Sequence, residues 1–147
     1  MDAAALQAAG WVSREAQGYT GFIAPLWMRG AAGVDRTIGF ITDARHANYH
    51  GTVHGGALMN FADIALGWIA ADALGATNCV TAQLAVQFVA APKIGEFVSC
   101  SAELVRHTSQ IIFVRGLITA DGRTVASADG IWKVVEPKPS MLADRAR

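Results

Sequence analysis

The chain has 147 residues, of which 52% are hydrophobic and 16% are charged, and its formal net charge is +0. Its Lys and Arg residues are scattered and form no basic stripe, which argues against a nucleic-acid partner. A single domain with so much apolar surface is expected to bury part of it against a partner chain.

The N-terminal third of the chain is predicted to be mostly extended. Residues 2–9 are rich in Ala and are expected to form a short helix. Residues 19–28 and 34–42 are candidate strands separated by a turn. Residues 43–54 are polar and contain several loop-forming residues, so a loop is predicted there.

Residues 56–73 form the longest predicted element. They are rich in Ala and Leu, lack proline and are apolar on nearly every face, which predicts a buried helix. Asn60, Asp63 and Asp72 interrupt the apolar run, so we expect no membrane span. The start of the sequence has no basic region ahead of an apolar core, so we expect no signal peptide and a cytoplasmic location.

The second half of the chain shows the alternating pattern of β-strands. Four strands are predicted, over residues 80–90, 97–106, 111–120 and 124–135, with a hairpin signal at Asp121-Gly122. Short connections imply an antiparallel meander, and one sheet face and one helix must bury each other. We therefore predict an α+β fold in which a curved antiparallel sheet wraps around one long central helix.

One domain is predicted, over residues 19–136. Residues 1–18 would form an N-terminal segment, and residues 137–147 a flexible tail. Cys79 and Cys100 have no metal-binding spacing, and two buried thiols are favoured over a disulfide.

Three histidines, His46, His50 and His54, recur at a spacing of four residues. Such histidines meet on one face only if the segment is helical. Asn48 and Gly51 interrupt any helix here, and no Glu stands between the histidines as in a zinc-protease helix. The spacing gives weak support for a metal site, and none is predicted.

The sequence His54-Gly55-Gly56 stands where the long helix is predicted to begin. Helix N-termini have unpaired backbone N–H groups and a partial positive charge, and glycines leave those amides accessible. Such amides can polarise a carbonyl oxygen that gains charge during a reaction. Two glycines also suit a tight turn, and the residues alone leave both interpretations open.

One acid lies in the middle of the apolar helix. Asp63 shares a helix face with Asn60 and Gly67, at spacings i, i+3 and i+7. A buried unpaired carboxylate is costly, so Asp63 needs either a hydrogen-bond partner or a catalytic task, and the catalytic task is favoured. Asp72, at the helix end, is interpreted as a solvated acid.

The stretch N-x-x-GTVHGG at residues 48–56, followed by Asp63, resembles the hotdog-fold acyl-CoA thioesterases of the phenylacetate-degradation (PaaI-like) type. Residues 81–96 and 121–135 are similar to the third strand and closing hairpin of that family. The resemblance covers residues 20–135. It implies the hotdog architecture, which agrees with the fold predicted above, and homodimers or homotetramers with active sites between subunits.

The resemblance also implies roles for individual residues. Asp63 of one subunit would act as nucleophile or as general base on water, facing the helix start of the other subunit. The amide of Gly55 or Gly56 would polarise the thioester carbonyl, and Asn48 would position the carbonyl or the water. His54 would hydrogen-bond the loop, and a capping or packing role is favoured for it.

Coenzyme A would be part of the substrate, so no separate cofactor is expected. Its phosphates would meet Arg106 and His107, which are equally consistent with solvated charges in a turn. Some members of the family place a Ser or Thr near the acid, early in the third strand. The candidates here are Thr81 and Ala82, and if Ala82 takes that place, Thr81 points the wrong way.

The favoured function is hydrolysis of an acyl-CoA thioester to free acid and CoA. The alternative is a hotdog module that binds an acyl thioester without hydrolysing it, although a pure binder gains little from Asp63 beside His54-Gly55-Gly56. A hotdog dehydratase would need a catalytic His paired with an acid in another motif, and the sequence shows no such segment.

Overall fold

The computed structural model describes residues 1–136, and the predicted tail at residues 137–147 lies outside this range. The helices and strands follow the chain in the order α1 (Ala3–Ala8), β1 (Val12–Arg14), β2 (Leu26–Arg29), β3 (Thr37–Ile41), α2 (Gly55–Leu74), β4 (Cys79–Phe88), β5 (Phe97–His107), β6 (Ile111–Ala120) and β7 (Arg123–Val134). Two short 3-10 helices, Thr20–Phe22 and Ala44–His46, lie in the connections.

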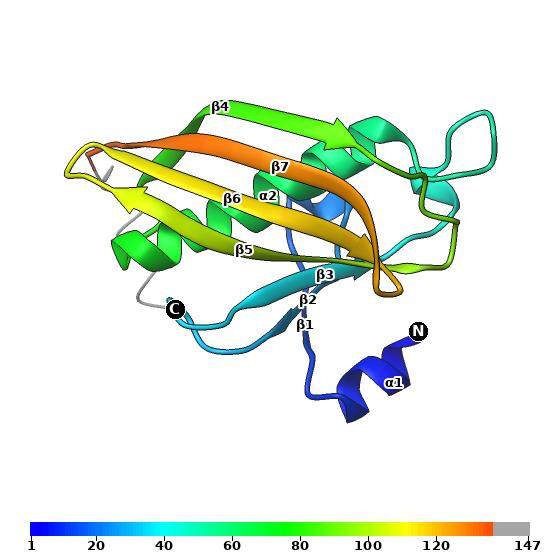
Figure 1. Ribbon diagram of the computed structural model, residues 1–147. Helices are drawn as coiled ribbons and strands as arrows, with labels where there is room; N and C mark the ends of the chain where they lie inside the picture. The colour runs from blue at the N-terminus through cyan, green and yellow to red at the C-terminus, as the bar shows by residue number, and fades with distance from the viewer. Residues whose placement is uncertain (137–147) are drawn as a thin grey trace.

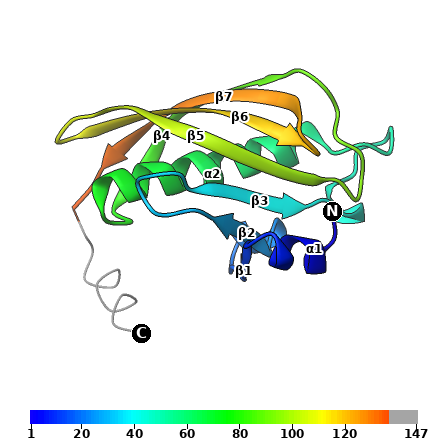
Figure 2. The same ribbon diagram turned by 60° about the horizontal axis from the view of Figure 1, so that its bottom comes forward.

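The strands form one antiparallel sheet in the order β1-β2-β3-β5-β6-β7-β4. The sheet curls around α2, with β4 to β7 passing over one side of the helix and β3, β2 and β1 lying on another (Figures 1 and 2). The predicted α+β fold, a curved antiparallel sheet around one central helix, is confirmed.

Both ends of α2 follow from local chemistry. His54 is the N-cap, and its Nδ1 accepts a hydrogen bond of 2.8 Å from the Gly56 N–H. Gly75 ends the helix with a left-handed φ of 67°, which glycine adopts without steric cost. By length and composition alone α2 could cross a membrane, but here it is the central helix that the sheet surrounds.

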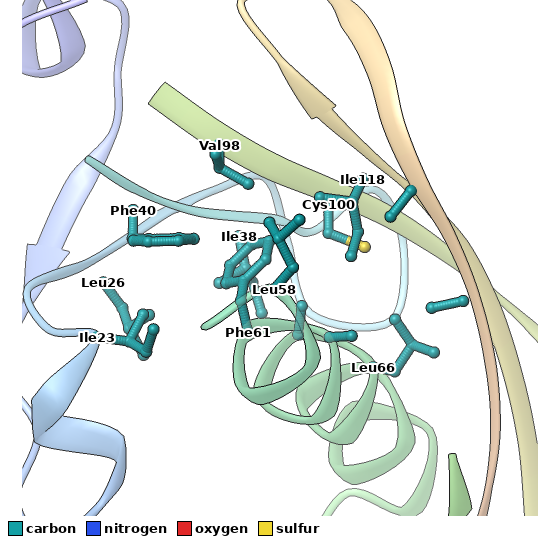
Figure 3. Packing of buried hydrophobic residues seen from close by; sticks show 14 of the residues in the cluster. Ile23, Leu26, Ile38, Phe40, Leu58, Phe61, Leu66, Val98, Cys100 and Ile118 are labelled. Atoms are coloured by element: carbon teal, nitrogen blue, oxygen red, sulfur yellow. The ribbon is translucent and has the colours of Figure 1, made fainter. Parts of the chain in front are cut away.

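The main core lies between α2 and the inner face of the sheet (Figure 3). Phe61 and Leu66 of α2 pack against Phe40 of β3, Val98 of β5 and Ile118 of β6, and all five side chains are fully buried. Burial of each such side chain contributes about 1.5–3 kcal/mol. The buried face of this apolar helix, Leu58, Phe61, Ala62, Ala65, Leu66 and Ala70, is the face that packs on the sheet.

A second apolar cluster lies on the opposite face of the sheet, under the N-terminal segment. Leu6 of α1 and Trp11 pack with Trp27 of β2 and Phe97 of β5. A side chain at Gly39 of β3 would collide with the Phe97 ring, so glycine is needed there. The predicted N-terminal helix is confirmed, and the segment that contains it continues into β1, which pairs with β2.

The sequence predictions differ from the structure in several places. Residues 19–28 are only partly extended, because Thr20–Phe22 form a helical turn and the strand begins at Leu26. The strand Val12–Arg14 was not predicted, since its three residues are all exposed and show no alternation. β5 continues to His107, one residue beyond the predicted end.

Both cysteines are free, as favoured from the sequence. Cys100 lies in the main core, where burial raises the pKa of its thiol to about 12. Cys79 is partly buried at the start of β4, and desolvation raises the pKa of its thiol as well.

Candidate active site

Asp63 lies midway along α2, partly buried, on the face that packs under β4. The Thr81 hydroxyl of β4 donates a hydrogen bond of 2.6 Å to Asp63 Oδ1. Asp63 Oδ2 accepts no hydrogen bond from any of residues 1–136. The carboxylate is therefore held through one oxygen, and the other is available to a ligand.

A β-bulge brings Thr81 to this face. The β4–β7 register shifts between Thr81 and Gln83, so Ala82 is the extra residue. Leu84 packs on the core, and strict alternation from there would turn Ala82 inward and Thr81 outward. The bulge reverses that alternation, so the Thr81 side chain points toward Asp63 and not away from it.

Asp63 and Thr81 line a cavity of about 390 Å³. The rest of its wall is mostly apolar and contains two indoles, Trp68 of α2 and Trp132 of β7. The remaining lining residues are Thr20, Ile64, Gly67, Ala71, Thr77 and Cys79. An apolar cavity with a few polar groups, one of them a fixed carboxylate, is typical of a small-molecule site.

The two glycine amides at the start of α2 differ in availability. The Gly56 N–H donates to His54 Nδ1, so it is already satisfied, and the capping role favoured for His54 is confirmed. The Gly55 N–H makes no hydrogen bond within residues 1–136, and it lies at the positive end of the helix. Gly55 borders a separate groove of about 260 Å³, together with Phe88 and Val89.

Asn48 organises the loop that precedes α2. Its Oδ1 accepts hydrogen bonds from the backbone of His50 (2.9 Å) and Thr52 (3.2 Å), and its Nδ2 donates to Thr52 Oγ1 (3.0 Å). The Val53 N–H donates to the carbonyl of Pro92 (2.9 Å), which ties this loop to the β4–β5 connection. One N–H of the Asn48 amide is left for a ligand.

Within one chain, Asp63 and the Gly55 amide do not meet. They are eight residues apart on the same helix, which separates them by about 12 Å along its axis. Accordingly they line different cavities, and Asn48 and His54 border a third. A carbonyl carbon beside Asp63 cannot also place its oxygen on Gly55 of the same chain.

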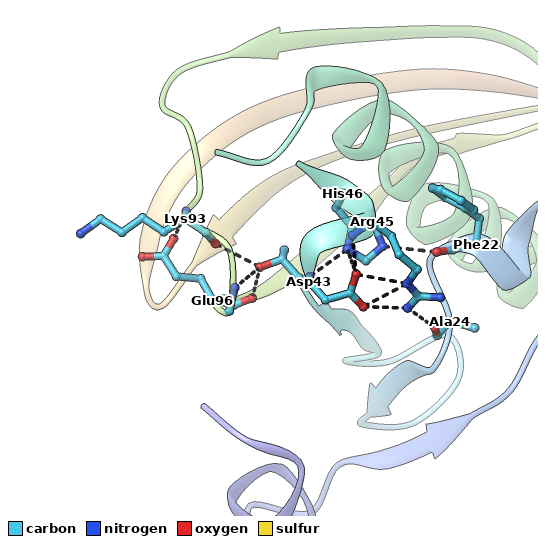
Figure 4. A network of polar contacts seen from close by, with 9 residues as sticks. Phe22, Ala24, Asp43, Arg45, His46, Lys93 and Glu96 are labelled. Atoms are coloured by element: carbon cyan, nitrogen blue, oxygen red, sulfur yellow. Dashed lines mark hydrogen bonds and ion pairs between the residues drawn. The ribbon is translucent and has the colours of Figure 1, made fainter. Parts of the chain in front are cut away.

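His46 lies in a polar network with Asp43 (Figure 4), whereas His50 and His54 line the cavity that Asn48 borders. His46 is buried; its Nδ1 accepts from the Asp43 N–H (3.0 Å), so Nε2 carries the proton donated to the Phe22 carbonyl (3.2 Å). Hydrogen bonds from Arg45 lower the pKa of Asp43 in the same network. Within residues 1–136, no group of three His, Cys, Asp or Glu side chains is placed to hold a metal ion.

Arg106 and His107 are exposed at the end of β5, within the strand rather than in the turn that follows it. Their strand end is adjacent to the start of β6 and the end of β7. Neither side chain forms an ion pair with a residue in the described part of the chain. Their role in binding phosphate stays a prediction.

The interpretation of Asp72 as a solvated acid is wrong. Arg36, in the β2–β3 connection, binds both carboxylate oxygens of Asp72, with Nε–Oδ2 at 2.5 Å and Nη2–Oδ1 at 3.2 Å. The two side chains are only 15% and 9% exposed. The same guanidinium lies 5.7 Å from the ring centre of Trp68, so this ion pair supports one wall of the cavity.

Comparison with known proteins identifies the family. The sequence profile described as the Thioesterase superfamily matches residues 50–127, more than half of the chain. The chain belongs to the thioesterase superfamily. The match begins two residues after Asn48 and includes Gly55, Asp63 and Thr81.

Relatives of this thioesterase-superfamily chain agree with that assignment. A Pseudomonas aeruginosa protein named "Putative esterase PA0474" is 26% identical over 111 residues, which are 75% of this chain and 83% of that protein. The PaaI protein from the E. coli phenylacetic acid degradation operon superposes with a TM-score of 0.68 at 18% identity, over 77% of this chain and 81% of that one. The smu.793 protein of Streptococcus mutans, solved with acetyl CoA, gives 0.71 at 18% identity, over 85% and 97%. The predicted hotdog fold is confirmed, and its structural neighbours include PaaI proteins.

Two features of this thioesterase-superfamily site were missed in the sequence. Trp132 had no signal of its own, because an inward Trp on a strand is indistinguishable from core. Arg36 is separated from Asp72 by 36 residues, so no local pattern connects them. The sequence feature that did locate the site was Asp63, the isolated acid in the middle of the apolar helix.

Proposed function

We propose that this chain is an acyl-CoA thioesterase that hydrolyses an acyl thioester to a free acid and CoA. The observation that supports it most directly is the Asp63 carboxylate, held by Thr81 at one oxygen and open to a cavity at the other. Membership of the thioesterase superfamily gives the reaction class. The acetyl CoA bound to the S. mutans protein supports CoA thioesters as the substrate class.

In the proposed mechanism Asp63 acts as general base. It takes a proton from a water molecule while the water oxygen attacks the thioester carbonyl carbon. Negative charge develops on the carbonyl oxygen, which the unpaired Gly55 N–H at the helix N-terminus stabilises. Collapse of the tetrahedral intermediate breaks the C–S bond, and the CoA thiolate leaves and takes up a proton. Attack by Asp63 itself to give an anhydride is the variant of this scheme.

The site is proposed to be completed by a second copy of the chain. β4 is an edge strand, paired only with β7 among the described residues, and Val80, Phe88 and Val89 on or after it are 47%, 52% and 63% exposed. Pairing of β4 with β4 of another subunit would satisfy this edge and cover the apolar side chains. The α2 helices would then run antiparallel, which brings each Asp63 toward the partner's helix start.

The test is thiol release from a panel of acyl-CoA thioesters by the wild type and by Asp63→Asn. The asparagine keeps the shape and can still accept from Thr81, but it cannot take a proton. We expect kcat to fall about 10²–10⁴-fold, the usual contribution of a general base.

Asp129→Asn is the matched control, because Asp129 is an exposed carboxylate on the outer face of β7. Its kcat should equal that of the wild type. Unchanged turnover in Asp63→Asn would remove Asp63 from the mechanism. A wild type that binds thioesters but hydrolyses none would identify a binding module instead.

A further inference from the structure

Trp132 occupies a central position in the cavity wall. It lies on the inner face of β7, directly opposite Thr81 in the β4–β7 register, and thus next to the residue that holds Asp63. Only 2% of its surface is exposed. Its side chain lines the same cavity as the Asp63 carboxylate.

The indole nitrogen of Trp132 has no hydrogen-bond partner in the described part of the chain. Nε1 donates no hydrogen bond to any residue from 1 to 136, although the N–H of a mostly buried indole normally has an acceptor. The Trp27 nitrogen, also unpaired, is sealed in the outer cluster; the Trp132 nitrogen is not enclosed in that way. It therefore retains access to the cavity that its ring lines.

Gly67 leaves the space in front of this N–H open. A Cβ built on Gly67 would lie 3.3 Å from Trp132 Nε1, closer than to any other atom of the ring. Gly67 also lines the cavity and lies one helical turn beyond Asp63, about 6 Å along the axis. The N–H thus faces the point on α2 where Gly67 has no side chain, one turn from the reacting carboxylate.

The polar groups near this point favour an oxygen-bearing ligand over a plain hydrocarbon. Hydroxyls of Thr20 and Thr77 line the same cavity, and neither donates to a residue within the described range. The intervening wall of Ile64, Ala71 and Trp68 is apolar. A chain that leaves Asp63 would cross this apolar wall and then meet hydrogen-bonding groups.

We infer that Trp132 is a specificity-determining residue, and that its indole N–H binds an oxygen on the acyl group of the substrate. This inference rests on the proposed thioesterase function. The substrate class it assigns is an acyl thioester with a hydroxyl or oxo group some bonds beyond the carbonyl. An acyl group without that oxygen would cover the N–H and leave it without an acceptor. That cost is paid only by the substrate that lacks the oxygen, so the site discriminates against it.

The probes are hexanoyl-CoA and a series of hexanoyl-CoA thioesters with one hydroxyl group at successive carbons. For the wild type, kcat/KM for the best hydroxylated member should exceed that for hexanoyl-CoA about tenfold, as expected for one buried hydrogen bond. Trp132→Phe keeps an aromatic ring and removes the N–H. The ratio of kcat/KM for the best hydroxylated member to kcat/KM for hexanoyl-CoA should fall to about one in this variant, because only the hydroxylated thioester uses the N–H.

Gly67→Ala is the second variant, because its methyl group crowds Nε1 from the helix without altering β7. It should lose the preference in the same way, with retained thermal unfolding as the control for folding. Equal hydrolysis of the whole series by the wild type, or a preference that survives in Trp132→Phe, would overturn this inference alone. A wild type that hydrolyses no member would overturn the thioesterase proposal as well.

Discussion

At the scale of single residues, one inserted position decides whether the site can form. Alternation from Leu84 toward the N-terminus of β4 predicts Ala82, not Thr81, beside Asp63. The bulge at Ala82 reverses the phase and delivers the hydroxyl. The sequence predicted the acid, because a lone carboxylate in an apolar helix is anomalous in any environment. It could not predict the bulge, which depends on pairing with a strand some fifty residues away.

The first residue-scale prediction concerns the hydrogen bond from Thr81. Thr81→Val keeps the shape of the side chain and removes the donor, so the Asp63 carboxylate loses its orientation. We expect kcat to fall about 10- to 100-fold, the range for loss of one hydrogen bond to a charged group. Steady-state kinetics on the best acyl-CoA substrate provide the measurement.

Thr81→Ser is the matched control, since it retains the hydroxyl and loses only a methyl group. Its kcat should lie within a few-fold of the wild-type value. If valine and serine behave alike, the hydroxyl has no part in orienting Asp63.

At the scale of elements, the long helix was predictable from the sequence. The ion pair that ties its C-terminal end to the β2–β3 connection was not. Composition, the absence of proline and the His54-Gly55-Gly56 start located α2 to within a residue at each end. Local rules place an acid at the end of a helix in solvent. In the structure the β2–β3 connection folds over that end, and Arg36 covers Asp72. Which loop returns to which helix end is a property of the whole topology.

This ion pair gives an element-scale prediction for stability. Because both side chains are mostly buried, Asp72→Ala leaves the Arg36 guanidinium without its counter-charge. The free energy of unfolding should fall by about 3–5 kcal/mol. Urea denaturation measures the change.

The replacement of both partners distinguishes a charge effect from simple loss of packing. Arg36→Met with Asp72→Leu fills the space with apolar groups and leaves no isolated charge, so it should recover most of the lost stability. Strictly additive losses in the double variant would contradict a coupled pair.

At the scale of the whole molecule, the overall architecture followed from the order of one apolar helix and four alternating strands. The hydrophobic pattern predicts a sheet that wraps the helix as the simplest arrangement, and the structure agrees. The same pattern does not show that Asp63 and Gly55 line separate cavities. Their separation of about 12 Å on one rigid helix makes the proposed site a property of two chains.

A subunit-mixing experiment tests that proposal directly. Asp63→Ala removes the base from one chain, and Gly55→Pro removes the amide from another. Proline is tolerated at the first position of a helix, and His54, at φ −65° and ψ 138°, already has the extended conformation required before proline. Gly55→Ala, which keeps the N–H, is the control for Gly55→Pro and should remain active.

Each variant alone should be nearly inactive, since every site in its homodimer lacks one of the two groups. Co-expression with two different affinity tags yields the mixed dimer, in which one site combines an intact Asp63 with an intact Gly55 from the other chain. That dimer should regain about half of the wild-type rate, because one of two symmetric sites is complete. A mixed dimer as inactive as its parents would show that Asp63 and Gly55 do not act across a subunit boundary. In that case the carbonyl must be polarised by some group other than the start of α2.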